Sequence, residues 1–318
     1  MIRNSKPQLA IVIHTEEEFN WDGGFYRSNN KVTHGQELIE FCEQMIAVDA
    51  KVTLAMDYAF VSSEQGQRVI NHLKSKPEAD VEFAAHLHPW VSPPFKDNDD
   101  QISEYSSYPG NLSKEEEFDK LKTLTDIIEE KAGFKPTTYL AGRYGVGENT
   151  YQTLSELGYT TDLSISPFAN FTHQQGPDFS QFDNQVVFND KIKCIPHSTG
   201  YISYIGAFAN YLNKDPNALP KLNNSFIGKV LLKLLGVKRV RLSPEGFTLK
   251  EMQKLTFSLK AIGIKEFIFS FHSPSVKVGL TPYVETEKDL TQFKQNTLDY
   301  IQWFTETGHG VNILVKSH

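Results

Sequence analysis

Short apolar runs alternate with longer segments of helical periodicity along most of this 318-residue chain. Runs rich in β-branched and aromatic residues predict strands, whereas apolar residues at every third or fourth position predict helices. The predicted strands span residues 8–14, 52–56, 81–85, 137–141, 160–164, 239–242, 266–271 and 311–315. The predicted helices span residues 34–48, 64–74, 113–132, 148–157, 248–261 and 287–305. This alternation is typical of an α/β fold in which helices connect the strands of a parallel sheet.

The number of predicted strands suits either a closed β/α barrel or an open doubly wound sheet, and the spacing does not separate the two. Residues 166–236 are irregular and rich in Phe, Asn, Pro and Gly. We expect this segment to be an insertion that covers one mouth of the sheet. Residues 1–318 are then expected to form a single domain that contains the insertion.

Within the insertion, residues 226–235 place apolar side chains on one helical face and are followed by Gly236. The face consists of Ile227, Val230, Leu231, Leu234 and Leu235. We expect a helix that packs this face against the core and ends at the glycine. We favour this over an interfacial helix assisted by Lys238, Arg239 and Arg241.

Charge and cysteine content exclude several classes of protein. Asp and Glu number 39 against 32 Lys and Arg, so the formal net charge is -7 and gives no support for a nucleic-acid partner. Cys42 and Cys194 are far apart, which argues against a disulfide framework and against a cysteine-rich zinc site. No run of apolar residues is long enough to predict a transmembrane helix. The apolar stretch near the N-terminus is too short for a signal peptide, so we expect a cytoplasmic protein.

Titratable side chains gather where the predicted strands end. Residues 14–18 end the first strand, His86 and His88 end the third, Arg143 follows the fourth, and His272 ends a late strand. The carboxyl ends of parallel strands meet at one edge of a sheet or one mouth of a barrel. We therefore expect these side chains to form one site.

His86 and His88 are two residues apart, so both imidazoles project to the same side of a strand end and can share a metal ion. On strand alternation Glu16 and Glu18 share one face, and Glu17 lies on the other. We favour Glu16 as the third ligand. Two imidazoles and one carboxylate suit Zn²⁺ or another divalent transition metal, and they leave open positions for water and substrate.

Two further histidines follow short apolar strands. His272 carries a titratable group with an ordinary pKa near neutrality, which suits a general acid or base. His197 can line the same mouth of the sheet, although a lone histidine beside a proline is more often structural.

The segments HTEEEFNW, HLHPW, AGRYG and FSFHSPS, in this order, resemble the polysaccharide deacetylase superfamily, carbohydrate esterase family four. They look closest to the WalW-like branch that is encountered with bacterial exopolysaccharide genes. The resemblance spans nearly the whole chain and implies a distorted β/α barrel with about seven parallel strands. It also implies metal-assisted hydrolysis of an acetyl group on a sugar.

The resemblance assigns roles to individual residues. The implied metal ligands are Glu16, His86 and His88, and the implied acid that protonates the leaving amine is His272. Trp90 stands where the family places its second histidine ligand, so His88 substitutes for that ligand and Trp90 is free to stack on a sugar. Asp162 matches an acidic position that supports the site, and its alternative is a loop residue bonded to its own backbone.

Two positions depart from the family pattern. His14 stands where one family branch has the Asp that acts as base, and Leu140 stands where the family has the Arg that orients it. In another register the base is Glu17 and the ligand is Glu18, and the sequence leaves the register open. Losing a buried Asp together with its Arg is physically coherent, because either charge alone is costly to bury. The pattern fits a mechanism with His14 as base and Arg143 reaching back to orient it, or a protein without catalysis.

Three hypotheses follow. The leading one is a divalent-metal-dependent hydrolase that removes an acetyl group from a carbohydrate, with metal-activated water and histidine acid and base. An alternative on the same scaffold is an amidohydrolase that opens a small cyclic amide. The third is a carbohydrate-binding relative with impaired catalysis, which the departures at His14 and Leu140 motivate.

Overall fold

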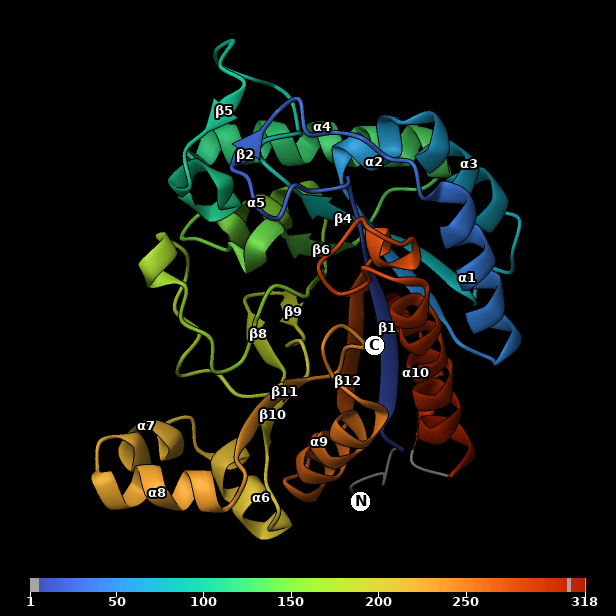
Figure 1. Cartoon of the computed structure of the whole chain (residues 1–318). Coiled ribbons are helices and arrows are strands. Elements are labelled where there is room, and N and C mark those ends of the chain that lie inside the picture. Colours follow the sequence, from blue (N-terminus) through green and yellow to red (C-terminus); the bar gives the residue numbers. More distant parts are fainter. Residues whose placement is uncertain (1–5, 308–309, 318) are drawn as a thin grey trace.

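The computed structural model of the chain describes residues 6–307 and 310–317 (Figure 1). At its centre a curled, mostly parallel sheet forms a distorted β/α barrel, as the family resemblance implied and the strand spacing alone could not decide. The strand order is β12-β1-β3-β4-β6-β7-β9-β8, and β13 also pairs with β1. The strands are β1 (Gln8–Thr15), β3 (Val52–Met56), β4 (Val81–Leu87), β6 (Thr138–Ala141), β7 (Thr161–Asp162), β8 (Val187–Asn189), β9 (Ile192–Cys194), β12 (Glu266–His272) and β13 (Val311–Ile313). The pairing of β8 with β9 is antiparallel, and the other pairings given for this sheet are parallel.

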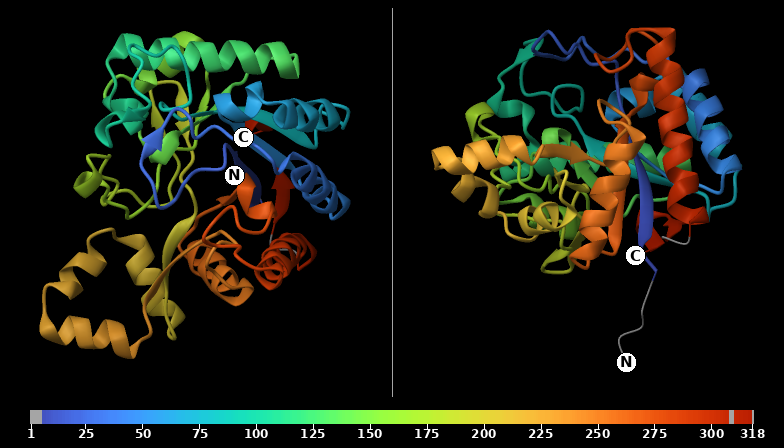
Figure 2. Two further views of the ribbon diagram at one scale, coloured as in Figure 1. Left: turned by 45° about the horizontal axis from the view of Figure 1, so that its top comes forward. Right: turned by 60° about the horizontal axis from the view of Figure 1, so that its bottom comes forward.

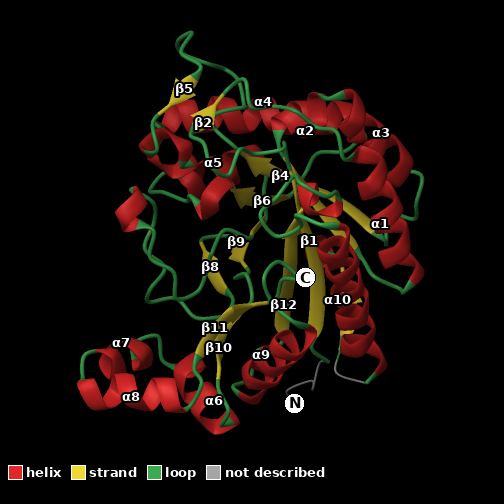
Figure 3. Ribbon diagram, in the orientation of Figure 1, coloured by secondary structure: helices red, strands yellow, loops and turns green. Residues whose placement is uncertain are grey.

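Helices cover the outer face of the sheet, as the red ribbons around the yellow strands show (Figure 3). They are α1 (Gly35–Ala47), α2 (Tyr58–Ser62), α3 (Glu64–Leu73), α4 (Lys114–Ala132), α5 (Thr150–Leu157), α9 (Leu249–Ala261) and α10 (Glu287–Glu306). Ser113 and Thr248 accept backbone N–H groups at the starts of α4 and α9, and Gly133 ends α4 in the left-handed conformation. Because these signals are local, the predicted helix bounds agree with the structure to within a few residues.

The residues of β1 alternate between two hydrophobic clusters. Leu9, Ile11 and Ile13 belong to the main core, which also contains the buried faces of the helices. Ala10 and Val12 belong to a smaller cluster with other strand residues. Side chains at every second position of a strand share a face, so the second cluster marks the inside of the barrel.

A gap between β12 and β9 is closed without strand pairing in the part of the chain that the structure describes. Successive N–H groups along the free edge of β12 donate to acceptors outside any strand. These pairs are Ile268 with Ser198 Oγ (2.9 Å), Ser270 with the Leu242 carbonyl (2.9 Å) and His272 with Glu245 Oε1 (3.0 Å). An ion pair of 2.9 Å between Lys193 of β9 and Glu266 of β12 also crosses the gap.

The segment 166–236 is partly an insertion and partly sheet. It contributes β8 and β9 to the barrel, and then β10 (Thr199–Ile202) leads into a helical lobe. We define the lobe as residues 203–237, with α6 (Gly206–Lys214), α7 (Ala218–Asn223) and α8 (Phe226–Leu234). The lobe projects from the barrel, which is clear in two further views (Figure 2).

The strand predicted at 239–242 is confirmed as β11 (Lys238–Arg241). It was expected to join the parallel sheet, and that is wrong, because it pairs antiparallel with β10 in a separate two-stranded sheet. The helix predicted at 226–235 forms, but its apolar face does not reach the core: Ile227 and Leu234 are 81% and 71% exposed. Only Gly228 and Leu232 of α8 are buried, because the small lobe has little interior to offer.

A second short antiparallel pair, β2 (Phe25–Tyr26) with β5 (Gln101–Ile102), lies beside the barrel mouth. Among the described residues, no helix has both the length and the apolar character needed to cross a membrane.

Candidate active site

Inward-facing positions of three strands end in histidines at one mouth of the barrel. In β1 the inward residues Ala10 and Val12 are followed two positions later by His14. The same alternation leads from Ala84 to His86 in β4 and from Ile268 to His272 in β12. His14 and His272 are direct neighbours in the sheet register. The strand geometry therefore brings together side chains that are far apart in the sequence.

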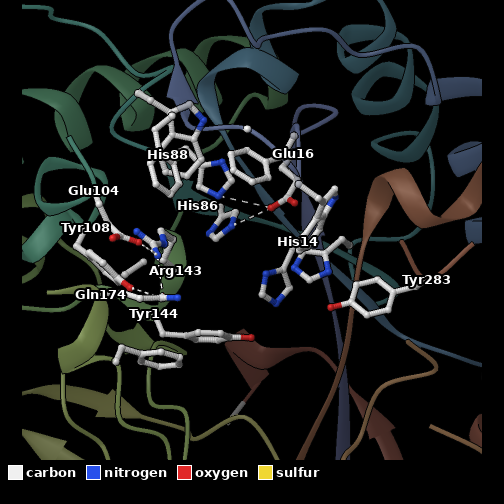
Figure 4. Close-up of a pocket in the computed structure, with 18 of the residues that line it drawn as sticks. His14, Glu16, His86, His88, Glu104, Tyr108, Arg143, Tyr144, Gln174 and Tyr283 are labelled. Carbon is white, nitrogen blue, oxygen red and sulfur yellow. Dashed lines mark hydrogen bonds and ion pairs between the residues drawn. The ribbon is translucent and has the colours of Figure 1, made fainter. Parts of the chain in front are cut away.

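These residues line a cavity of about 480 Å³, which Figure 4 shows in close-up. Aromatic side chains make up much of its wall: Phe19, Trp21, Phe25, Trp90, Tyr108, Tyr144, Phe171 and Tyr283. Polar and titratable groups converge at its floor, namely His14, Glu16, His86, His88 and His272. A second cavity of about 340 Å³ adjoins the first and shares Phe171, Arg241, His272 and Tyr283 with it.

Two imidazoles face one carboxylate oxygen. Glu16 Oε2 lies 3.3 Å from His86 Nε2 and 3.5 Å from His88 Nε2. The opposite nitrogen of each ring is held: His86 Nδ1 lies 2.9 Å from the Leu140 carbonyl, and His88 Nδ1 lies 3.0 Å from Glu17 Oε2. Both of these partners are acceptors, so each ring carries its proton on Nδ1 and presents an Nε2 lone pair to Glu16.

This arrangement fits a divalent metal ion. Burial lowers the pKa of His86 and His88, which favours the neutral form that binds metals. Burial opposes ionisation of Glu16, but His272 and the neighbouring histidines outweigh it and lower the Glu16 pKa to about 2. A cation between Glu16 Oε2 and the two Nε2 atoms would contact all three of them. The donor set of one oxygen and two nitrogens, with outer partners fixing the rings, suits Zn²⁺ and similar metals.

His14 lies beside this set. One ligand atom each from His14, Glu16 and His86 lie within 4.8 Å of one another, so His14 is placed either to bind the same ion or to contact its water. Burial and the neighbouring rings of His272 and His86 hold the pKa of His14 well below its usual range. The imidazole is therefore neutral near neutral pH.

The three consecutive glutamates have three different environments. Glu16 faces the cavity, whereas Glu17 lies behind His88 and also accepts the indole N–H of Trp90 at 2.7 Å. Burial raises the pKa of Glu17 to about 7 and that of the adjacent Asp57 well above its usual range. Glu18 points away and bonds Thr33 and His34. These positions therefore give no support to the alternative in which Glu18 is the metal ligand and Glu17 is the base.

His34 connects Glu18 to the backbone of Glu16 through Ser273. His34 Nε2 lies 2.8 Å from the hydroxyl oxygen of Ser273, which accepts the backbone N–H of Glu16 at 3.1 Å. These contacts connect the loop after β1 to the turn after β12. They position the backbone from which Glu16 reaches the cavity.

His272 forms a tight pair with Glu245. His272 Nδ1 lies 2.8 Å from Glu245 Oε2, and the other carboxylate oxygen accepts the His272 backbone N–H and the Ser275 hydroxyl. Burial disfavours the charged imidazolium, but the carboxylates of Glu245 and Glu16 outweigh burial and raise the pKa of His272 to about 9. His272 is therefore protonated near neutral pH. In the cavity the neutral His14 therefore lies next to the charged His272, with ring centroids 4.8 Å apart.

Arg143 does not contact His14 or Glu17, contrary to the orienting role considered for it. Its guanidinium donates to Ser107 and Gln174 and pairs with Glu104 at 3.2 Å, near the outer rim of the cavity. The reason is its backbone: Arg143 and Tyr144 both adopt positive φ after β6, which turns Arg143 toward the aromatic rings of the rim. Leu140 is buried inside the barrel.

The three residues predicted to contact substrate differ in placement. Trp90 lines the cavity, but it is only 2% exposed and stacks on the His88 ring at 4.2 Å. Asp162 and His197 are fully buried and do not line the cavity. Asp162 accepts from the backbone and hydroxyl of Ser164, and His197 lies behind His14 and Tyr144.

The sequence reasoning missed Glu245 and Asp57. Asp57 directly follows β3, and Glu245 lies three residues after the strand predicted at 239–242. The signal was therefore present: both are acidic residues just beyond a strand end, the same criterion that identified the histidines.

Comparisons with known proteins bear on the fold. No protein-family model matches the chain, and no curated protein matches it either. Among solved structures, a 4-alpha-glucanotransferase from Thermococcus litoralis is 12% identical with a TM-score of 0.53 and covers 98% of this chain but 40% of its own. PuuE allantoinase is 12% identical with a TM-score of 0.50, covering 98% and 88%. The Bc1960 peptidoglycan N-acetylglucosamine deacetylase is 8% identical with a TM-score of 0.46, covering 98% and 87%. At these identities the likeness to the glucanotransferase and to the allantoinase concerns the fold alone.

Proposed function

We propose that this protein is a divalent-metal-dependent hydrolase that removes an acetyl group from an N-acetylated carbohydrate. The observation that carries the proposal is the convergence of Glu16, His86 and His88 opposite a protonated histidine, His272, within one aromatic cavity. Membership of carbohydrate esterase family four, and of its WalW-like branch, is part of the proposal and is supported by the motifs of the sequence.

Glu16, His86 and His88 would hold the metal, with Glu17 and the Leu140 carbonyl fixing the two rings. A divalent ion held by these residues would supply Lewis-acid chemistry, polarising an amide carbonyl and lowering the pKa of bound water. Glu17 is a positioning residue in this mechanism, because it is fully buried behind His88 and has no access to the cavity.

His14 and His272 supply the proton transfers. His14 is neutral and lies beside the ligand set, so it accepts the proton of the attacking water. His272 is protonated and donates to the amine nitrogen as the carbon–nitrogen bond breaks, which avoids expulsion of a poor leaving group. Glu245 holds the His272 ring in orientation and keeps it charged.

The cavity wall suits a sugar ring. Trp21 and Tyr283 lie next to His272, with ring centroids 5.4 Å and 6.4 Å from it. Aromatic rings offer apolar faces for the C–H groups of a pyranose, while their polar edges and Arg143, Glu104 and Gln174 can bond hydroxyls.

The test uses the full chain loaded with Zn²⁺, with metal content measured by elemental analysis and acetate release measured on N-acetylglucosamine oligomers. We expect about one equivalent of metal and turnover in the wild type. The Glu16→Gln variant is expected to lose both. Glu129→Gln, a matched change at an exposed position of α4, should keep both.

Each other result decides between the hypotheses. Absence of bound metal after reconstitution with Zn²⁺, Co²⁺ or Ni²⁺ overturns the proposal. Bound metal with no acetate release, but with opening of a cyclic amide such as a hydantoin, favours the amidohydrolase. Sugar binding without any turnover favours the carbohydrate-binding relative that the replacement of the family's base by His14 motivates.

A further inference from the structure

The helical lobe exposes a continuous set of large apolar side chains. We define the apolar face of the lobe as Tyr204, Ile205, Phe226, Ile227, Val230, Leu231 and Leu234. Phe226 is 83% exposed and Ile227 is 81% exposed, values that are uncommon for such residues on a folded domain. Together these residues make one patch rather than scattered single side chains, because five of them lie on α8.

Residues four positions apart on α8 form rows along the helix, and each row lies on a different side of it. Phe226, Val230 and Leu234 form one row at every fourth position, and Ile227 and Leu231 form the next row. Gly228 and Leu232 form the row that faces the lobe, where a Cβ on Gly228 would lie 2.1 Å from the Leu222 carbonyl oxygen. The helix is thus fixed against α7 by its small residue, and its apolar rows point outward.

The charge of this region is opposite to that of the whole chain. No acidic residue occurs between Asp215 and Glu245, whereas the chain as a whole has a formal net charge of -7. The basic residues of this stretch are Lys221, Lys229, Lys233, Lys238, Arg239 and Arg241. Lys229 and Lys233 form a row on α8 beside the row of Phe226, so positive charge borders the apolar face.

We propose that the lobe docks on the surface of an anionic lipid bilayer. The apolar rows of α8 then enter the headgroup and acyl-chain boundary while Lys229 and Lys233 bind lipid phosphates. A helix of nine residues is far too short to span a bilayer, for which roughly 20 residues are needed, so α8 lies in the plane of the surface.

Charge argues for lipid rather than for a second copy of the chain. A two-fold contact through the apolar face would place the same basic residues of two copies against each other, and like charges across an interface are unfavourable. An anionic lipid surface complements both features at once. The lobe also projects from the barrel, so a flat surface can reach it without contacting the barrel first (Figure 2).

The lobe is connected to the candidate active site by β10 and β11. Lys238 and Ile202 pair at the lobe end of this ladder, and Arg241 and Thr199 pair at the other end, where Arg241 lines the cavity. The β10–β11 ladder therefore runs from the lobe to the wall of the cavity. The docking itself is independent of whether the site turns over substrate.

The test is sedimentation of the full chain with vesicles of phosphatidylcholine containing about 30% phosphatidylglycerol, compared with pure phosphatidylcholine. We expect binding to the anionic vesicles that weakens with salt. The double variant Ile227→Glu/Leu234→Glu should bind at least about tenfold more weakly, and Lys229→Glu/Lys233→Glu should lose the preference for anionic lipid. Phe188→Glu is the matched control, because Phe188 is 68% exposed but lies on β8.

Thermal unfolding of each variant shows whether it is folded. We expect all of them to fold, because the substitutions are at exposed positions. Wild-type protein that stays in the supernatant with anionic vesicles overturns the proposal. Equal loss of binding in Phe188→Glu also overturns it, because the effect is then not specific to the lobe. A dimer in light scattering that dissociates in Ile227→Glu/Leu234→Glu, without vesicle binding, identifies a second copy as the occupant instead.

Discussion

His272 and Glu245 determine how the proposed activity depends on pH. The acid must be protonated, and its pKa is raised to about 9, so the rate is expected to fall only as the pH rises through that region. Replacing Glu245 with Gln removes the negative charge that holds the proton. The alkaline limb of the kcat/KM profile should then move down by about one to two pH units.

The same pair contributes to stability, and the sign follows from the direction of the shift. A histidine with a raised pKa stabilises the folded state fully below its ordinary value of 6.5, and the contribution is lost as the pH rises through about 9. Metal-free wild type should therefore lose more stability between pH 7 and 9 than Glu245→Gln does. Parallel stability curves for the two proteins in urea would contradict the assignment.

His14 is predicted to act on protons rather than to hold the metal. His14→Gln keeps a similar size and removes the basic nitrogen, so kcat should fall by about 10²–10⁴-fold while bound metal stays at the wild-type level. Metal content and kcat measured on the same preparation separate the two roles. Loss of metal together with activity would instead make His14 a metal ligand, a role that its position within 4.8 Å of Glu16 and His86 also permits.

At the level of single residues, strand alternation was the informative signal. It placed Glu16 apart from Glu17, and the structure shows Glu16 facing the cavity with Glu17 behind His88. It gave no information on side chains that reach the site from irregular loops. The position of Glu245 just after a predicted strand was visible in the sequence. Its contact with His272, 27 residues further on, depends on how α9 and β12 pack, which no local pattern encodes.

At the level of elements, Asn213 holds the lobe on the barrel. Its side chain accepts the Tyr201 N–H at 2.6 Å and donates to the Tyr201 carbonyl and to the Ser258 hydroxyl, both at 2.8 Å. The Asn213 side chain thereby hydrogen-bonds the edge of β10 that does not pair with β11, as a neighbouring strand would. It also connects α6 to α9. The residue is fully buried, so the amide has no access to water.

Asn213→Ala is expected to lower the free energy of unfolding by about 2–4 kcal/mol, because it leaves the buried N–H and C=O groups of Tyr201 without a partner. Urea denaturation measures this. Asn223→Ala, an exposed residue at the end of α7, is the control and should change stability by less than about 0.5 kcal/mol. Equal effects of the two substitutions would show that Asn213 does not hold the lobe.

The elements themselves were predictable where the signals are local. Most strand and helix positions in the barrel followed from periodicity and from capping residues such as Ser113 and Thr248, whereas β8 and β9 were not predicted. The lobe shows where such reasoning stops. Periodicity identified α8 and its apolar face, but it cannot say which surface covers that face, and the structure leaves Ile227 and Leu234 exposed. For the same reason β11 was predicted as a strand but not as part of a separate sheet.

At the level of the whole molecule, closure of the barrel connects the fold to the site. Strand pairing runs from β12 around to β8 and leaves the other edge of β12 unpaired within the described residues. Ser198, Leu242 and Glu245 satisfy successive N–H groups along that edge. The last of these is also the partner of the His272 imidazole. The contacts that close the barrel and the contact that orients the proposed acid therefore form one continuous row.

Ser198 gives a direct test of this closure. Its side-chain oxygen accepts the Ile268 N–H at 2.9 Å in a buried position, where water cannot replace it. Ser198→Ala should therefore lower the free energy of unfolding by about 1–3 kcal/mol, because a buried N–H is left without an acceptor. Ser155→Ala on the exposed side of α5 is the control, with an expected change within about 0.5 kcal/mol.

The loosened edge in Ser198→Ala should also speed hydrogen exchange of the Ser270 and His272 amides. The increase should be larger than for the amides of β3, which is paired on both sides. Unchanged exchange along β12 in a destabilised variant would mean that Ser198 acts only through its own bond, and that the barrel is closed by Leu242 and Glu245 without it.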